Sequence, residues 1–282
     1  MVSEMKIAII PNIKKDIGLV VTTELLRHLQ GRAEVYMESA FSMSGLQAEY
    51  TDDIYSHADM VIVLGGDGTI LQVAEPCARR GIPILGINLG RIGFMSEIER
   101  EEMDMAVNRI LSGDYRLQKR MMMKIQIYHA GKLQGTYHAL NDAVIAKSAE
   151  TRLMGMELFS SDEKISEYAA DGLIISTPTG STGYNLSAGG PVVNPMMELF
   201  IAAPICAHML TARPAVLPAD DKIRVRLTDR FSVNEAAVSV DGDICGYIKG
   251  GDEIVITKSG YETKLVKISE KSFYDVLINK LT

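Results

Sequence analysis

The sequence has few cysteines, no tryptophan and no long apolar run. Its three cysteines, Cys77, Cys206 and Cys245, are odd in number and far apart, which argues against a disulfide framework and predicts reduced, buried thiols. No apolar stretch approaches the roughly 20 residues that a membrane-spanning helix needs, and residues 1–6 lack the apolar segment of a signal peptide. We therefore expect a cytoplasmic protein without a membrane partner.

An excess of basic residues is also lacking, because 29 lysines and arginines stand against 36 aspartates and glutamates, for a net charge of −7. This balance argues against a nucleic-acid partner, which needs a basic surface. An anionic small molecule would have to be bound by local amides and a few cations, because the overall field opposes it. The phosphate-binding loop Gly-x₄-Gly-Lys-Ser/Thr is absent. The histidines are scattered without a Cys/His cluster, so we expect no metal ion held in a protein cage.

The pattern of apolar segments predicts two domains. In residues 1–115 buried strands alternate with helices, which indicates a Rossmann-like α/β domain with a parallel sheet. In residues 116–265, period-two alternation and glycine turns predict an antiparallel β domain, sandwich-like or barrel-like, whose short strands continue to Thr257. The last segment, 266–282, carries a helix over 272–281 that we expect to pack back on the first domain.

The stretch from Met60 to Thr69 carries the strongest chemical signal. Its first five residues are apolar, which predicts a strand buried on both faces, and Gly65-Gly66-Asp67-Gly68 follows. Glycines let a ligand approach the backbone, and the amides that open the helix after Thr69 favour an anion. A carboxylate beside an anion site is what phosphoryl transfer to a hydroxyl requires. Taken alone, the four residues also fit an ordinary strand-to-helix turn.

Three further stretches add weaker signals. The pair Asn141-Asp142 offers an amide and a carboxylate that suit the two vicinal hydroxyls of a ribose. The block from Asp171 to Gly190 is dense in hydroxyl groups and glycines, which predicts an ordered loop suited to a polar heterocycle and phosphates. The strand exit 86–94 approximates a dinucleotide fingerprint in which Asn88 replaces the first glycine.

Together these four segments resemble the NAD kinase family, ATP-dependent enzymes that phosphorylate NAD to NADP. The resemblance covers nearly the whole chain, and its most specific part is the block from Asp171 to Gly190, in which Thr-Pro-Thr-Gly-Ser-Thr follows Asp-Gly. It implies NAD and ATP as substrates, with polyphosphate as another donor, and transfer to the 2′-hydroxyl of the adenosine ribose. It further implies a divalent ion, Mg²⁺, carried with the donor, and a homodimer or homotetramer.

The resemblance also implies roles for single residues. Asp67 would be the general base for the 2′-hydroxyl, and Gly68 would lie against the phosphates. Asn141 and Asp142 would hold ribose hydroxyls and part of the adenine. Asp171 would reach the nicotinamide end, in some members across a subunit interface. Phe94 would stack on adenine or serve as plain core. Further ligand contacts are implied for Arg152, Thr179, Thr182, Gly183, Tyr184, Asn185, Leu186 and Ser187.

Two departures from the family and two alternative functions remain open. Gly183 stands where the family usually has alanine, and Asp243 where many members have glutamine, which leaves a ligand contact by Asp243 in doubt. A lipid kinase of the diacylglycerol type shares the Asp67 motif, but it would be expected to show an apolar groove or a basic patch for a membrane. A non-catalytic NAD(P)-sensing module would bind the dinucleotide, but it has no need for the Asp67 carboxylate.

Overall fold

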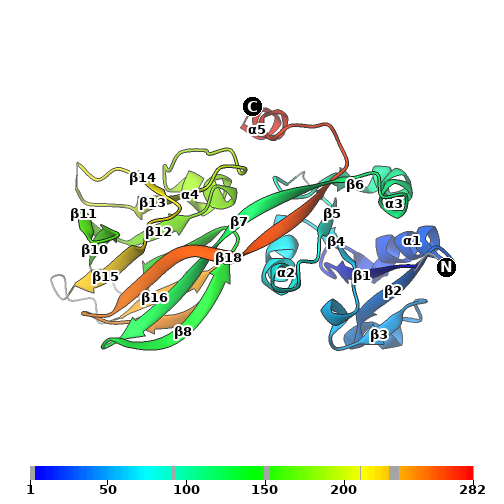
Figure 1. Ribbon diagram of the computed structural model, residues 1–282, viewed down its shortest axis with the longest axis horizontal. Helices are drawn as coiled ribbons and strands as arrows, with labels where there is room; N and C mark the ends of the chain where they lie inside the picture. The colour runs from blue at the N-terminus through cyan, green and yellow to red at the C-terminus, as the bar shows by residue number, and fades with distance from the viewer. Residues whose placement is uncertain (1–3, 91–92, 149–152, 210, 229–234, 282) are drawn as a thin grey trace. The chain divides into compact units, whose positions relative to one another are not determined.

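The computed structural model describes residues 4–90, 93–148, 153–209, 211–228 and 235–281. The chain divides into two compact units, Met1–Lys119 with Thr263–Thr282, and Arg120–Glu262 (Figure 1). Two long strands, β7 (Arg116–His129) and β18 (Glu253–Lys267), each contribute residues to both units.

The first unit contains a parallel sheet in the order β3-β2-β1-β4-β5-β6, the order of a doubly wound nucleotide-binding sheet. This confirms the predicted Rossmann-like domain. The order reverses between β1 and β4, and open α/β sheets bind ligands beyond the carboxyl ends of the strands at such a point. The strands are β1 (Met5–Pro11), β2 (Ala33–Glu38), β3 (Glu49–Thr51), β4 (Met60–Gly65), β5 (Ile84–Asn88) and β6 (Ile98–Glu99).

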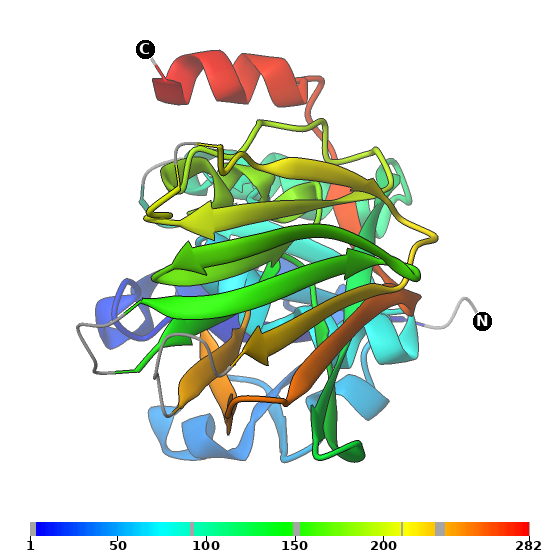
Figure 2. The ribbon, with the colours of Figure 1, turned by 90° about the vertical axis from the view of Figure 1, so that its left-hand side faces the viewer.

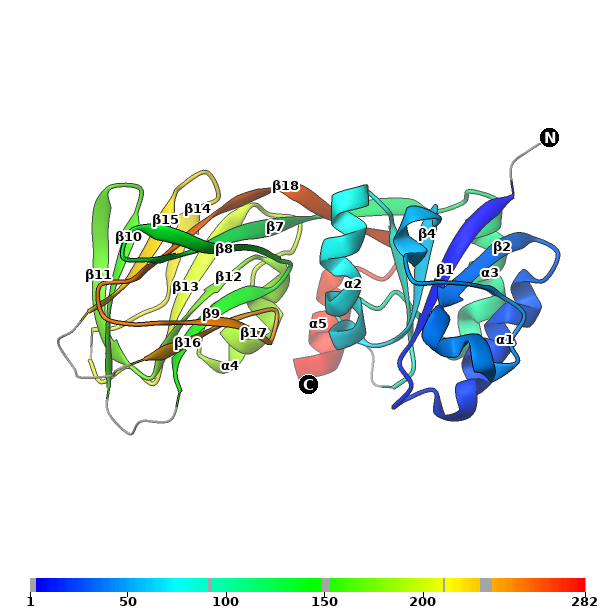
Figure 3. The same ribbon diagram turned by 90° about the horizontal axis from the view of Figure 1, so that it is seen from below.

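Helices cover both faces of this sheet, with α1 (Val20–Leu29) and α3 (Met103–Leu111) on one side and α2 (Asp67–Arg80) on the other (Figure 3). Every residue of β4 is buried, so the predicted strand with two covered faces is confirmed. Alternate strand residues pack with α1 and α3 in one apolar core that includes Ile9, Ile62 and Leu25. Short 3₁₀ turns complete the connections: η1 (Ile17–Leu19), η2 (Ser39–Ser44), η3 (Ile54–Ser56) and η4 (Arg100–Glu102).

The second unit consists of antiparallel strands around one large apolar core, as predicted. One sheet has the order β14-β13-β12-β9-β16-β17, and its core-facing residues, such as Phe200, pack with those of β10, β15 and β18, such as Met156 and Val225. Figure 2 looks onto the green and yellow strands, which run side by side. The strands are β8 (Lys132–Ala139), β9 (Asp142–Lys147), β10 (Met154–Ser160), β11 (Glu163–Ala170), β12 (Gly172–Ser176), β13 (Leu199–Ile205), β14 (Ala215–Pro218), β15 (Ile223–Thr228), β16 (Ala236–Val240) and β17 (Asp243–Ile248).

Two expectations from the sequence are wrong in detail. The last strand does not stop at Thr257, because β18 runs on to Lys267 through Gly260, whose glycine resembles a turn signal but whose backbone stays extended in the strand. The cysteines are not all buried: Cys77 is, but Cys245 is half-buried and Cys206 is exposed. The final helix α5 (Phe273–Leu281) belongs to the first unit. Among the described residues, no helix combines the length and apolar character needed to cross a membrane.

Candidate functional site

Asp67 opens α2 directly after β4, and its carboxylate is bound by the chain that follows β5. One oxygen, Oδ2, accepts a hydrogen bond from the Phe94 amide at 2.7 Å. The other, Oδ1, accepts from the amides of Met95 at 3.1 Å and Ser96 at 3.3 Å, and from the Ser96 hydroxyl at 3.2 Å. The carboxylate is therefore held in one orientation by fixed donors, while Oδ2, with one described donor, keeps a lone pair for a substrate hydroxyl.

This close approach depends on a glycine. A Cβ built on Gly93 would overlap the Asp67 carboxylate, with all three of its end atoms inside contact distance. Gly93 therefore allows the backbone after β5 to pass against Asp67. In the sequence the strand exit 86–94 resembles a weak dinucleotide fingerprint, and nothing in its pattern links it to Asp67.

The loop after β1 lies at the same edge of the sheet. The Asn12 amide donates to the Thr69 hydroxyl at 2.9 Å, which ties this loop to the first turn of α2. The Lys15 ammonium lies over the glycine turn, 3.0 Å from where a Cβ on Gly66 would be and 3.6 Å from the same point on Gly90. Neither Asn12 nor Lys15 was predicted as a site residue. The signal that could have found them is the strand order, since the exits of β1 and β4 flank the reversal point.

Phe94 is half-buried and is covered by residues of α5. The Phe273 ring centroid lies 6.0 Å from that of Phe94, and the Lys280 ammonium lies 4.5 Å from the Phe94 ring centroid, a cation–π contact.

Asp142 begins β9 and Asn141 comes directly before it, and one carboxylate fixes the backbone of both residues. Asp241 accepts hydrogen bonds from the amides of Leu140, Asn141 and Asp142 at 2.7, 2.8 and 3.1 Å. Burial, together with the neighbouring Asp241 charge, raises the pKa of Asp142 to about 7. Asp243, for which the family resemblance left a ligand contact in doubt, is exposed, and the residue that touches the predicted site is Asp241.

The hydroxyl-rich block packs directly on Asn141. The Thr177 amide donates to the Asn141 carbonyl at 2.8 Å, a Cβ on Gly180 would overlap that carbonyl, and one on Gly183 would lie 3.6 Å from Asn141 Nδ2. Thr179 lies in the same turn, η5 (Thr179–Thr182). The Asn141 Oδ1 and the Thr179 hydroxyl are buried and, within the described chain, lack a hydrogen-bond partner. Unpaired buried polar atoms are costly unless a ligand or water pairs them, so this group fits a bound polar molecule.

The four residues of α4 (Tyr184–Ser187) face in different directions. Asn185 is fully buried, and its amide donates to the carbonyls of Ser181 at 3.0 Å and Pro191 at 3.1 Å, so it holds the loop together from inside. Tyr184 and Ser187 are exposed, and Leu186 is half-buried. These contacts give the block the ordered structure that its sequence predicted.

Asp171 lies apart from this group. Asp171 precedes β12 and the hydroxyl-rich turn follows β12. A five-residue strand of about 16 Å therefore separates Asp171 from that turn. Its carboxylate forms an ion pair with Lys147 at 2.5 Å. Within one unit the structure therefore brings together Asn141, Thr179 and Gly183, and it does not bring Asp171 to them. Arg152 lies outside the described residues.

No three His, Cys, Asp or Glu side chains in the part of the chain that is described gather where they could hold a metal ion. Comparison with known proteins adds to this geometry. A family model for the ATP-NAD kinase N-terminal domain matches residues 7–115, and one for the ATP-NAD kinase C-terminal domain matches residues 140–268.

Relatives and solved structures agree with these models. The chain is 40% identical over 282 residues to an NAD kinase of Lachnoclostridium phytofermentans, with 98% of each chain covered. It is 43% identical over 223 residues to an NAD kinase of Heliobacterium modesticaldum, with 79% of this chain and 78% of the relative covered. Among solved structures it is similar to yeast NADH kinase complexed with NADH, at a TM-score of 0.88 and 26% identity, covering 99% of this chain and 87% of the other. It is also similar to an NAD kinase from Archaeoglobus fulgidus in complex with ATP, at a TM-score of 0.74 and 25% identity, covering 98% of each.

These findings support the NAD kinase interpretation and not the lipid-kinase alternative. The models together span most of the chain, and the relatives match it along nearly its full length. The chain belongs to the ATP-NAD kinase family.

Proposed function

We propose that this protein transfers the terminal phosphoryl group of ATP, or of polyphosphate, to the 2′-hydroxyl of the adenosine ribose of NAD, giving NADP. The observation that carries the proposal is the Asp67 carboxylate, held by backbone amides at the opening of α2 with an oxygen available to a hydroxyl. The names of the relatives, and the NADH and ATP in the two solved neighbours, support the choice of substrates.

In this reaction Asp67 Oδ2 accepts the proton of the 2′-hydroxyl as the new bond between that oxygen and the terminal phosphorus forms. The bond between this phosphorus and the bridging oxygen breaks, and ADP leaves with the electron pair. A ribose hydroxyl is only weakly acidic, so a positioned base contributes roughly 10²–10⁴-fold to the rate. The remaining work is positioning and charge neutralisation, and the amides that open α2 beside Gly68 favour the phosphates.

Asn141, Asp142 and Thr179 would bind the dinucleotide through the buried polar atoms described above, with Thr182, Gly183, Tyr184, Leu186 and Ser187 around it. Asn185 would act by holding this loop in shape. Phe94 would stack on adenine and Arg152 would contact the ligand. Because Asp171 stands a strand length from Asn141, we propose that it serves the nicotinamide end of an NAD bound to another copy in a homodimer or homotetramer.

A Mg²⁺ ion would enter with the donor. The chemistry of the described residues fits this arrangement, because phosphate oxygens and water satisfy Mg²⁺ without the protein cage that these residues do not form. When bound, the ion would neutralise phosphate charge. We propose the cytoplasm as the place of action, in line with the few cysteines.

The direct test is to incubate the protein with NAD, ATP and Mg²⁺ and to assay NADP with a dehydrogenase specific for it. Asp67→Asn is the control, since asparagine preserves the shape of the side chain but cannot accept the proton. We expect NADP formation by the wild-type protein well above that control. Equal, background-level signals would refute the kinase function and leave the NAD(P)-sensing module, while phosphorylation of diacylglycerol in a parallel assay would favour the lipid kinase.

A further inference from the structure

The Lys15 ammonium stands out among the cations of the first unit. It lies over the backbone of the Gly65-Gly66-Asp67 turn, at the distances from Gly66 and Gly90 given above. Both of these neighbours are glycines, so no side chain of Gly66 or Gly90 occupies the space beside the ammonium. Within the described chain no carboxylate or carbonyl oxygen pairs with this ammonium, whereas Lys6 and Lys267 of the same unit each form an ion pair. A surface lysine without a partner usually extends into solvent. Lys15 instead lies over the glycine turn, where contacts of its loop hold it.

The loop that carries Lys15 is fixed on both sides. The amides of Lys15 and Asp16 donate to the Asn12 carbonyl at 2.9 and 2.8 Å. Asp16 is buried, and its carboxylate accepts hydrogen bonds from the amides of Val21 and Thr22, each at 2.9 Å. The loop is thereby tied to the start of α1, and Asn12 ties it to Thr69. Lys15 is therefore presented from a rigid turn at the point where the strand order reverses.

A second, independent observation lies beside it. Asn88, at the end of β5, is buried, and its amide nitrogen donates to the Gly90 carbonyl at 2.6 Å. Its Oδ1 lies 3.9 Å from the Cβ position of Gly66 and, among the described residues, has no hydrogen-bond partner. A hollow of about 430 Å³ is lined by Lys15, Asn88 and Gly90. Glu99, Arg100 and Glu101 line it too, and Arg100 is paired with Glu24 at 2.7 Å.

We propose that Lys15 binds the phosphate chain of the donor, while Asn88 binds a water or a protonated group of the same ligand. This inference rests on the proposed function for the identity of the donor. The protein carries a net charge of −7, so a polyanion needs a local cation beside the opening of α2. Lys15 offers a full positive charge there, and a lysine is a point charge suited to a phosphate chain.

The test compares Lys15→Gln, Lys15→Arg and the matched control Lys14→Gln, which removes the same charge from the adjacent exposed residue. Steady-state kinetics give KM for ATP and for NAD separately. We expect Lys15→Gln to raise KM for ATP about 10- to 100-fold, the loss expected for one charge-assisted hydrogen bond. KM for NAD should change less than about two-fold, Lys15→Arg should restore most of the ATP affinity, and Lys14→Gln should resemble the wild-type protein.

Calorimetric binding of inorganic tripolyphosphate separates this inference from the kinase function, because it requires no turnover. Tripolyphosphate binding that weakens in Lys15→Gln but not in Lys14→Gln supports the inference even if the wild-type protein makes no NADP. Unchanged tripolyphosphate binding and unchanged KM for ATP in Lys15→Gln would overturn it. Equal losses in both variants, or a parallel loss of NAD affinity, would overturn it as well, since they would show a general charge or folding effect.

Discussion

The predicted site residues of the first unit and those of the second unit are held in opposite ways. In the first unit the functional group is a charge, Asp67, and the chain around it supplies amide donors and a glycine that lets them approach. In the second unit the groups are neutral buried acceptors, Asn141 Oδ1 and the Thr179 hydroxyl, which the fold leaves unpaired. In the first unit most hydrogen-bonding positions of the carboxylate are occupied by protein donors, which fixes its orientation for catalysis. In the second unit the buried acceptors still lack donors among the described residues, so they are free to bind a ligand. Changes in the first unit should therefore act on turnover, and changes in the second on NAD affinity.

The largest expected effect comes from Asp67→Asn. Asparagine keeps one acceptor oxygen for these backbone amides in place of two, and it cannot take the proton. We expect kcat to fall by about 10²–10⁴-fold with little change in the Kd for NAD, measured by the coupled NADP assay and by calorimetry. Circular dichroism checks that the fold is retained. Loss of NAD binding as large as the loss of turnover would break the division between the units.

Gly93→Ala should have the next largest effect. Its Cβ would overlap the Asp67 carboxylate and push it from its amide donors, and displacements near 1 Å cost on the order of 10²-fold in rate. The matched control is Gly260→Ala, which lies in a strand with open space around the added methyl group. A Gly93→Ala enzyme with wild-type kcat would show that the orientation of Asp67 is not critical.

The raised pKa of Asp142 predicts a pH-dependent stability. In the folded protein its pKa is about 7, above the usual value of 3.8, so between these values the folded state binds more protons than the unfolded state. This residue therefore lowers the free energy of unfolding as pH rises from about 4 to 7. Asp142→Asn removes this dependence. The free energy of unfolding of the variant, relative to that of the wild-type protein, should therefore rise by roughly 1–3 kcal/mol between pH 5 and pH 8, as measured by urea denaturation. An equal difference at both pH values would contradict the shift.

The smallest expected effect is that of Asp241→Asn. The asparagine carbonyl can replace some of the hydrogen bonds to the amides of Leu140, Asn141 and Asp142, but without the charge. We expect KM for NAD to rise about 5- to 10-fold, the loss of roughly one hydrogen bond's strength, with kcat nearly unchanged. Asp243→Asn, at an exposed position, should have no effect. A fall in kcat without a change in KM would contradict the recognition role.

The sequence predicted those parts of the molecule that depend on local pattern. The strand at Met60–Gly65, the parallel and antiparallel units and the ordered hydroxyl block all follow from apolar runs, alternation and glycines. It could not predict that Gly260 lies inside β18, because glycine marks turns and strands alike until its neighbours are known.

The residues that the sequence analysis missed act over long separations. Asp241 caps a turn a hundred residues earlier, at Asn141, and Lys15 reaches glycines after two other strands. No local pattern records such contacts, although the strand order would have placed the β1 exit beside Asp67. Asn185 lies inside a stretch that was expected to contact the ligand, but its side chain points inward and supports the loop.

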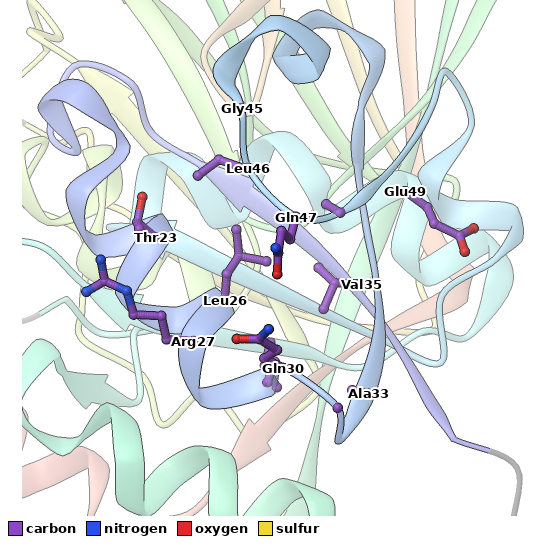
Figure 4. A pocket seen from close by; sticks show the side chains of 13 residues that line it. Thr23, Leu26, Arg27, Gln30, Ala33, Val35, Gly45, Leu46, Gln47 and Glu49 are labelled. Carbon is purple, nitrogen blue, oxygen red and sulfur yellow. The ribbon is translucent and has the colours of Figure 1, made fainter.

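The first unit contains a second hollow. It measures about 600 Å³ and lies between α1, β2 and the chain before β3, with Leu26 and Val35 on its floor and Arg27 and Gln47 at its rim (Figure 4). It contains none of the residues predicted for the site, so substitutions such as Gln47→Ala are useful controls for the kinetic comparisons above.

The most direct measurement is a crystal structure of the protein with NAD and a non-hydrolysable ATP analogue. We predict an Asp67 carboxylate oxygen within about 2.6–3.2 Å of the 2′-oxygen of the adenosine ribose, with the Phe94 and Met95 amides still bound to the carboxylate. A ribose whose 2′-oxygen is hydrogen-bonded elsewhere, with Asp67 contacting only its own loop, would contradict it.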